Sequence, residues 1–294
     1  MATVDTVMEH EHDVEAQQGD AWDGGRPPFK ASYGKLMMWY FLLSDAFTFA
    51  GFLIAYGALR FSSPTWPVPD FVFKTDPFGI HTLFPNGAPL IFVTFMSFLL
   101  IISSVTMVRA VQEGHRENKN GVVFWMILTI FGGLGFLSCQ AWEWTNLIAD
   151  EHMSVTTNPF GSHVVAGEYL EDEHGHTYKE GEAREKFEAG DSYLIHKDHD
   201  TGEWIQRSYV ATDGTVRRQE FGPKAFGALF FFITGFHGFH VFSGVAFLTI
   251  IAINAASGLY MQRRNGHEMV EKIGLYWHFV DLVWVFVFLV FYLL

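Results

Sequence analysis

The chain has 294 residues, of which 49% are hydrophobic and 17% aromatic, and its formal net charge is −13. This charge excludes nucleic acid as a partner, because binding phosphate groups requires clustered Lys and Arg. The single cysteine, Cys139, excludes an internal disulfide, and its apolar surroundings indicate a structural thiol.

Residues 1–35 are acidic and polar and contain no apolar run. They lack both the apolar core and the small-residue cleavage pattern of a signal peptide. This composition predicts a disordered tail. His10 and His12 lie in the tail among charged residues, and we interpret them as solvated side chains.

Five apolar segments are long enough to cross a bilayer as helices. A hydrocarbon core about 30 Å thick needs roughly 20 apolar residues, at about 1.5 Å of rise for each. Pro89 and Pro223 stand where two of the helices start, and a missing N–H does no harm there. The sequence therefore predicts an all-α polytopic membrane protein. The predicted spans are residues 36–59, 88–110, 122–149, 225–256 and 272–294.

The orientation of the spans follows from Lys and Arg in the short loops, because these residues are retained on the cytoplasmic side. Only Arg60 and Lys74 lie in the short loop on the other side. The long 150–222 segment is exempt from the rule. We therefore expect the N-terminus in the cytoplasm, and the C-terminus and residues 150–222 outside it. The predicted cytoplasmic cations are Arg26, Lys30, Lys35, Arg109, Arg116, Lys119, Arg263, Arg264 and Lys272.

Residues 150–222 form a polar insertion with 16 Asp and Glu against 7 Lys and Arg. Its short alternating runs are separated by turn formers at 200–202 and at Asp213-Gly214, which indicate hairpins. We expect a small β-rich extracytoplasmic module whose acidity suits the docking of a basic electron carrier or an adjacent complex. Four of its histidines match no metal-site spacing and are interpreted as surface residues: His174, His176, His196 and His199.

Three acids lie within the predicted spans: Asp45, Glu143 and Asp281. An unpaired charge costs several kcal/mol there, so each acid is a functional hypothesis. Asp45 is about 14 Å deep, near the bilayer midplane, and should be protonated or hydrogen-bonded. It is either a tuned acid near a proton or lipid pathway or a neutral acid bonded to a neighbouring helix. Glu143 lies between Trp142 and Trp144, whose indoles prefer the interface, and this pattern favours an interhelical hydrogen bond.

Histidines mark one face of each of the last two spans. His237 and His240 share a face at i, i+3, as do His278 and Asp281. A di-iron bundle would need Glu-x-x-His on two helices, but no acid stands three residues before His237. Haem would need histidines that face one another, such as His237 or His240 with His278. Interhelical hydrogen bonding is the preferred interpretation, and we assign no metal ligand.

The run FFFITGFHGFHVFSG, followed by YWHFVDLVWVFVFLVFYLL, resembles subunit III of the haem-copper respiratory oxidases. The segments LSCQAWEW and LLSDAFTFAGF are similar to the third and first spans of its five-helix bacterial form. The resemblance covers about residues 33–150 and 221–294. Mitochondrial members have seven helices, and the first two are missing here. An arginine that anchors a lipid phosphate in the longer members would fall near Asn254, so that lipid site is not carried over.

On this resemblance, Asp45 occupies the position of the family's carbodiimide-reactive carboxylate, which is more often a Glu. His237, His240, His278 and Asp281 match signature positions that pack and form hydrogen bonds. Subunit III carries no haem or copper. The family implies a subunit without a catalytic centre, which stabilises the catalytic subunit and supports proton uptake in an oxidase that reduces O₂ to water.

The resemblance thus implies an accessory subunit of a bacterial aa3-type oxidase, fed by cytochrome c, in the inner (plasma) membrane. Haem a and copper are expected in partner subunits and no cofactor in this chain. The expected partners are oxidase subunits I and II, phospholipids and, through the acidic insertion, cytochrome c or an adjacent quinol-oxidising complex. A quinol oxidase subunit and a homologue associated with nitric oxide reductase stay open. A stand-alone haem or di-metal membrane enzyme would instead use His237, His240, His278 and Glu143 as ligands.

Overall fold

A computed structural model describes residues 32–73, 90–179, 183–198, 202–262 and 267–294. The chain divides into two compact units, residues 1–40 and residues 41–294. In the first unit, the described residues begin helix α2 (Tyr33–Ser62), and the Ser32 hydroxyl accepts a hydrogen bond from the Lys35 N–H (3.4 Å). Residues 33–35, which we assigned to the tail, therefore already belong to the helix. The rest of the predicted tail, residues 1–31, lies outside the described residues.

The prediction of five membrane-length helices is confirmed within the described part of the chain. The last helix begins four residues before its predicted start, because its first turn is polar but still helical. Two helices end in a π-helical turn, η2 (Asn146–Asp150) and η3 (Leu289–Leu293). Two short helices, α3 (Pro69–Val72) and α7 (Leu259–Gln262), lie in the connections. The four long helices after α2 are α4 (Ile91–His115), α5 (Lys119–Thr145), α6 (Lys224–Ala256) and α8 (Glu268–Phe288).

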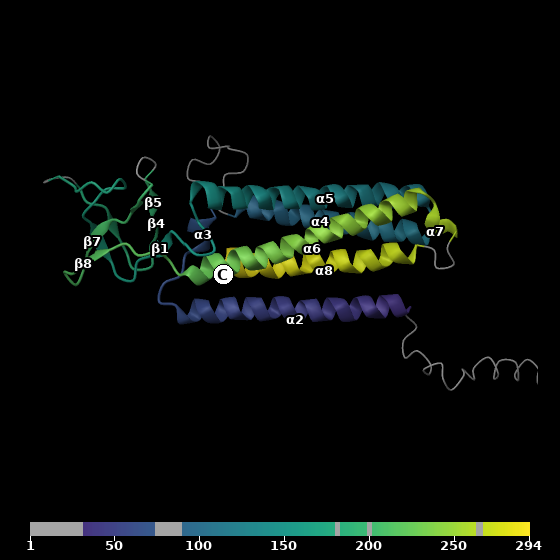
Figure 1. Cartoon of the computed structure of the whole chain (residues 1–294), viewed down its shortest axis with the longest axis horizontal. Helices are drawn as coiled ribbons and strands as arrows, with labels where there is room; N and C mark the ends of the chain where they lie inside the picture. The colour runs from purple at the N-terminus through teal and green to yellow at the C-terminus, as the bar shows by residue number, and fades with distance from the viewer. Residues whose placement is uncertain (1–31, 74–89, 180–182, 199–201, 263–266) are drawn as a thin grey trace, which may run out of the picture. The chain divides into compact units, whose positions relative to one another are not determined.

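Helices α4, α5, α6 and α8 pack side by side as a bundle (Figure 1). Small residues allow close packing of these helices. A Cβ on Gly133 would lie only 2.6 Å from the Trp277 ring and 2.7 Å from Val245. The indole N–H of Trp277 donates to the Ser103 hydroxyl (3.1 Å), which ties α8 to α4. Polar contacts of this kind hold helices together in lipid, where the hydrophobic effect does not.

From residue 41 onward, helix α2 contacts the bundle chiefly through aromatic side chains. Phe49 lies 5.1 Å from Phe236 on α6, between ring centroids, and Tyr56 lies 4.3 Å from Phe291 in η3. The Arg60 guanidinium also donates to the main-chain oxygen of Leu294. These contacts place the middle of α2 beside α6.

The insertion between α5 and α6 is a small β module, as predicted (Figure 1). One antiparallel sheet has the strand order β3-β2-β7-β8, and two strand pairs, β1-β4 and β5-β6, complete the module. The strands are β1 (Phe160–Ser162), β2 (Gly167–Tyr169), β3 (Lys186–Phe187), β4 (Ser192–Leu194), β5 (His196–Lys197), β6 (Trp204–Ile205), β7 (Ser208–Ala211) and β8 (Val216–Arg218).

Both predicted hairpins pair as expected. Val210 lies opposite Val216 across the Asp213-Gly214 turn, where Gly214 has a φ of +80° that favours glycine. His196 pairs with Ile205 around the second turn, whose residues 199–201 lie outside the described part of the chain. One face of the four-stranded sheet forms a small core of Tyr169, Phe187, Tyr209 and Ala211.

Candidate functional site

The polar side chains within the membrane-length helices form the candidate site. Asp45 on α2 and His240 on α6 are brought together, with Asp45 Oδ2 3.0 Å from His240 Nε2. Both side chains are about nine-tenths buried. Asp45 Oδ2 forms no hydrogen bond within the described residues, so the interaction with His240 is a close polar contact. The rings of Phe49 and Phe236 pack against the same imidazole.

The other ring nitrogen of His240 decides how protons are distributed in this pair. Nδ1 lies 2.8 Å from the carbonyl oxygen of Phe236, and because a carbonyl only accepts, Nδ1 carries a proton. The pair is electrically neutral when it holds one further proton, on either Asp45 or Nε2. A neutral pair avoids the cost of a net charge at membrane depth. The pair can therefore hold a single proton, on either of two neighbouring helices.

Glu143 is fully buried near the end of α5, and its partner is Tyr292 in η3. The phenolic hydroxyl donates to Glu143 Oε2 at 2.9 Å. Oε1 has no hydrogen-bond partner within the described residues. One turn earlier on the same helix, the Gln140 amide donates to the Thr234 carbonyl on α6 (3.1 Å). Glu143 thus joins α5 to the C-terminal turn. The sequence did not single out Tyr292, because no local pattern distinguishes it from the other aromatics of the last span.

His237 lies on the same helix face as His240 but in different surroundings. Its ring is completely buried, and neither nitrogen forms a hydrogen bond within the described part of the chain. Aromatic rings surround it, with Trp284 at 5.2 Å and Phe136 at 5.7 Å between centroids. The interhelical hydrogen bond that the sequence favoured is not formed here, because the nearest neighbours on α5 and α8 are aromatic.

The last histidine is linked to another helix. A 2.6 Å hydrogen bond joins His278 Nδ1 on α8 to the Ser104 hydroxyl on α4. Asp281, one turn further along α8, is half-buried, and its Oδ1 has no hydrogen-bond partner within the described residues. The sequence could not identify Ser104, because it stands beside Ser103 and is one of several hydroxyl residues in an apolar helix.

The candidate residues are thus separated into several contacts. Asp45 meets His240, Glu143 meets Tyr292, and His278 meets Ser104. Among the residues that the structure describes, no group of three or more His, Cys, Asp or Glu is arranged to hold a metal ion. The arrangement is suited to joining helices and, at the Asp45–His240 pair, to holding a proton.

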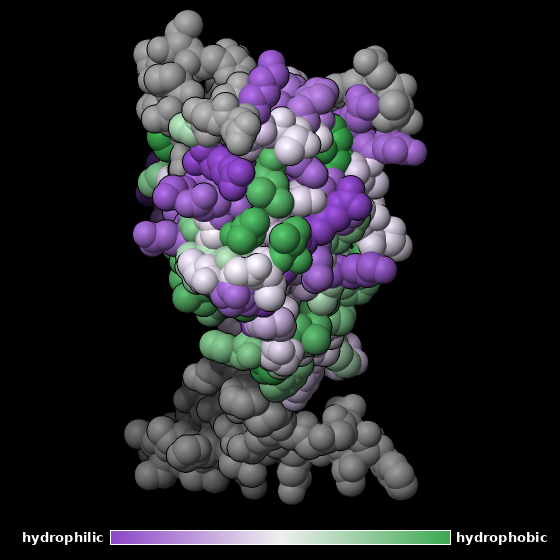
Figure 2. Space-filling view, turned by 90° about the vertical axis from the view of Figure 1, so that its left-hand side faces the viewer, coloured by the Kyte–Doolittle hydropathy of each residue, from purple (hydrophilic) through white to green (hydrophobic). Residues whose placement is uncertain are grey.

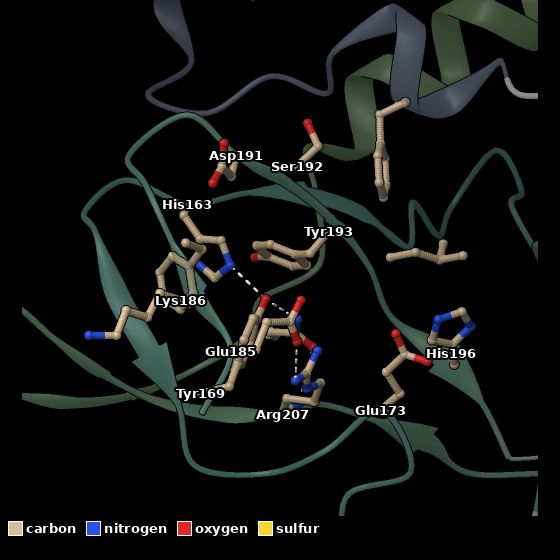
Figure 3. Close-up of a pocket in the computed structure, with 14 residues that line it drawn as sticks. His163, Tyr169, Glu173, Glu185, Lys186, Asp191, Ser192, Tyr193, His196 and Arg207 are labelled. Atoms are coloured by element: carbon tan, nitrogen blue, oxygen red, sulfur yellow. Dashed lines mark hydrogen bonds and ion pairs between the residues drawn. The ribbon is translucent and has the colours of Figure 1, made fainter. Parts of the chain in front are cut away.

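A second group of polar residues surrounds a pocket of about 420 Å³ in the β module (Figure 3). His163, only 4% exposed, lines it, and a 2.7 Å hydrogen bond joins its Nε2 to the Tyr169 hydroxyl. The Arg207 guanidinium stacks on the Tyr169 ring (3.6 Å to its centroid) and donates to Glu185 Oε2 at 2.6 Å. Burial lowers the pKa of His163 to about 4; Arg207 shifts it in the same direction, whereas Asp191 and Glu185 oppose the shift.

Comparison with known proteins shows which family the chain belongs to. The family model described as "Cytochrome c oxidase subunit III" matches residues 17–171 and 215–294. The chain belongs to the cytochrome c oxidase subunit III family. The match includes all five membrane-length helices and omits residues 172–214. Much of the β module is therefore an addition to the family's membrane bundle.

Curated relatives include both cytochrome c and quinol oxidase subunits. Cytochrome c oxidase subunit 3 of Struthio camelus is 25% identical over 260 residues, which is 88% of this chain and 68% of that protein. Cytochrome bo(3) ubiquinol oxidase subunit 3 of Pseudomonas putida is 24% identical over 266 residues, 88% of this chain and 84% of the relative. Cytochrome c oxidase subunit 3 of Alkalihalophilus pseudofirmus is 24% identical over 264 residues, which is 88% of this chain and 85% of the relative. The two bacterial subunits III are thus matched over more of their length.

Proposed function

We propose that this subunit III is the cofactor-free accessory subunit of a bacterial aa3-type cytochrome c oxidase, in the inner membrane with its N-terminus in the cytoplasm. Its partners are the oxidase subunits I and II, which carry haem a and copper, and phospholipids. The contact between Asp45 and His240 supports the proposal most directly. Asp45 and His240, both at signature positions of the family, contact each other at a membrane depth where an unpaired ionisable group is costly.

The proposed role has two parts. Subunit III stabilises the catalytic subunit by presenting a bundle whose helices are joined through Ser103–Trp277 and Ser104–His278. It supports proton uptake through the single proton that the Asp45–His240 pair can hold. Any redox chemistry is completed in the neighbouring subunits.

We further propose cytochrome c as the electron donor, because it is basic and the module is acidic. Figure 2 shows hydrophilic side chains over much of the face that carries the module. A quinol oxidase subunit is the second candidate, favoured by the long match to the Pseudomonas putida relative. The nitric-oxide-reductase-associated homologue and the stand-alone haem or di-metal enzyme have no such observation in their favour.

One preparation tests the class of function. The chain is purified by an affinity tag both alone and from its native membrane, and the co-purifying subunits, metal content and visible spectrum are determined. We expect haem and copper only in the native complex. Stoichiometric haem or iron in the isolated chain would overturn the accessory role. Oxygen consumption with reduced cytochrome c or with ubiquinol then identifies the donor.

A further inference from the structure

The module pocket is not explained by membership of the family. Most of its lining lies within residues 172–214, which the family model omits. It is built from loops and strand ends, with Glu185, Tyr193 and Arg207 on one side and Glu173 and His196 on the other (Figure 3). Its volume of about 420 Å³ accommodates a long side chain or a small organic molecule.

The positive charges in the pocket wall are already engaged within the module. The Lys186 ammonium lies 2.8 Å from Glu168. Arg207 is paired with Glu185 and also donates through Nε to the Glu171 carbonyl (3.0 Å). The lining contains three carboxylates, of Glu173, Glu185 and Asp191, and only these two cations. The pocket therefore keeps an excess of negative charge.

Glu173 carries much of that excess. Its side chain is exposed, and it forms no hydrogen bond or ion pair within the described part of the chain. Tyr193 and Phe71 add aromatic rings to the lining. Carboxylates beside aromatic rings are the environment that binds ammonium and guanidinium groups, through charge and through the π faces.

His163 supplies an independent observation in the same wall. Its side chain is more than nine-tenths buried, yet its Nδ1 has no hydrogen-bond partner among the described residues. A buried polar atom without a partner costs about 1–3 kcal/mol. In the tautomer in which Nε2–H donates to the Tyr169 hydroxyl, Nδ1 is an acceptor, and an ammonium or guanidinium N–H that reaches it recovers part of that free energy. The ring is neutral at physiological pH and adds no positive charge to repel a cation.

We propose that this pocket binds an organic cation of the size of a lysine or arginine side chain, with Glu173 as its principal counter-charge. The cation is either a free alkylammonium or guanidinium compound or a basic side chain of a partner protein. Recognition is the same in both cases. This inference does not depend on which electron donor the oxidase uses.

The test measures binding of Nα-acetyl-lysine methylamide to the intact purified complex by saturation-transfer NMR. We expect binding that weakens about tenfold in Glu173→Gln and changes less than twofold in Glu188→Gln. Glu188 is a matched control, because it is an exposed acid of the same module that does not line the pocket. Glu173 is preferred to Glu185, whose replacement would leave the buried Arg207 unpaired.

A neutral analogue provides the second comparison. The Nε-acetylated form of the same probe should not bind. Equal binding of the two forms, or an equal loss in both Glu→Gln variants, would overturn the proposal. Basic cytochrome c and a lysine-acetylated sample then distinguish the sources. If unmodified cytochrome c displaces the probe and acetylated cytochrome c does not, the pocket binds a basic side chain of a partner protein. If neither form displaces the probe, the pocket binds a free cation.

Discussion

Asp45 on α2 and His240 on α6 approach to 3.0 Å, and this contact lies on a helix that otherwise meets the bundle chiefly through aromatic rings. The contact has a direct consequence for assembly, because it is one of the few polar links between α2 and the other helices. Losing either partner leaves the other buried without it. Such a loss costs about 1–3 kcal/mol.

We therefore predict that Asp45→Ala leaves the haem content of the complex unchanged while impairing assembly or long-term turnover. The measurements are the haem-to-protein ratio, the amount of subunit III retained after purification, and the decay of oxygen consumption with time. Ser44→Ala is the control, because its hydroxyl bonds only to the Phe41 carbonyl of its own helix. Loss of haem from an otherwise assembled Asp45→Ala complex would contradict the prediction.

The Glu143–Tyr292 bond predicts a second stability effect. Tyr292→Phe removes the donor to a fully buried carboxyl group and should lower the free energy of unfolding by about 1–3 kcal/mol. Thermal unfolding of the purified complex measures this change. Thr249→Val is the comparison, because its hydroxyl bonds only within α6. Equal midpoints for the two variants would show that the bond adds nothing to stability.

His163 predicts a pH dependence of the module. Its pKa of about 4 in the folded chain is below the ordinary value of about 6.5, so the unfolded chain binds more protons between these values. The free energy of unfolding of the module should fall as the pH decreases through this window, by up to about 1.4 kcal/mol per pH unit. Hydrogen exchange of the β2 and β7 amides, corrected for intrinsic rates, measures this.

His163→Phe keeps a ring stacked on Phe187 and should remove the pH dependence. The His163 and Phe187 centroids are only 3.6 Å apart, so a phenyl ring fits the same stack. His174→Ala, at an exposed position, should leave the pH dependence unchanged. If both variants kept the wild-type dependence, another group would be responsible.

The acidic module predicts a salt-dependent association with a basic partner. Replacing residues 172–214 with a short Gly-Ser linker removes the segment of the insertion that the family model does not match. The association with cytochrome c should then weaken more at low salt than at high salt, because salt screens exposed charges beyond about 10 Å at 0.1 M. Steady-state kinetics at several ionic strengths measures it. An unchanged low-salt KM would show that the module does not dock the donor.

Periodicity and length were enough to predict most of the fold. Apolar runs predicted the five helices, and Asp213-Gly214 predicted the β7–β8 hairpin, because turn chemistry is local. The partners of the site residues were not predictable in this way. Ser104 and Tyr292 come from other helices, and which side chains meet depends on the rotation of each helix in the bundle.

By itself, the sequence determined that this is a membrane protein with five apolar helices and an acidic insertion. The helices were predictable because the thickness of the bilayer fixes how many apolar residues a spanning helix needs, and the acidity of the insertion follows from its composition. It also carried the motifs that mark subunit III of the oxidases. The tertiary structure decided that His240 meets Asp45 whereas His237 is enclosed by aromatic rings, although both share one helix face. It also decided that distant residues of the insertion enclose one pocket. Both outcomes depend on packing between segments far apart in the chain, which local pattern does not encode.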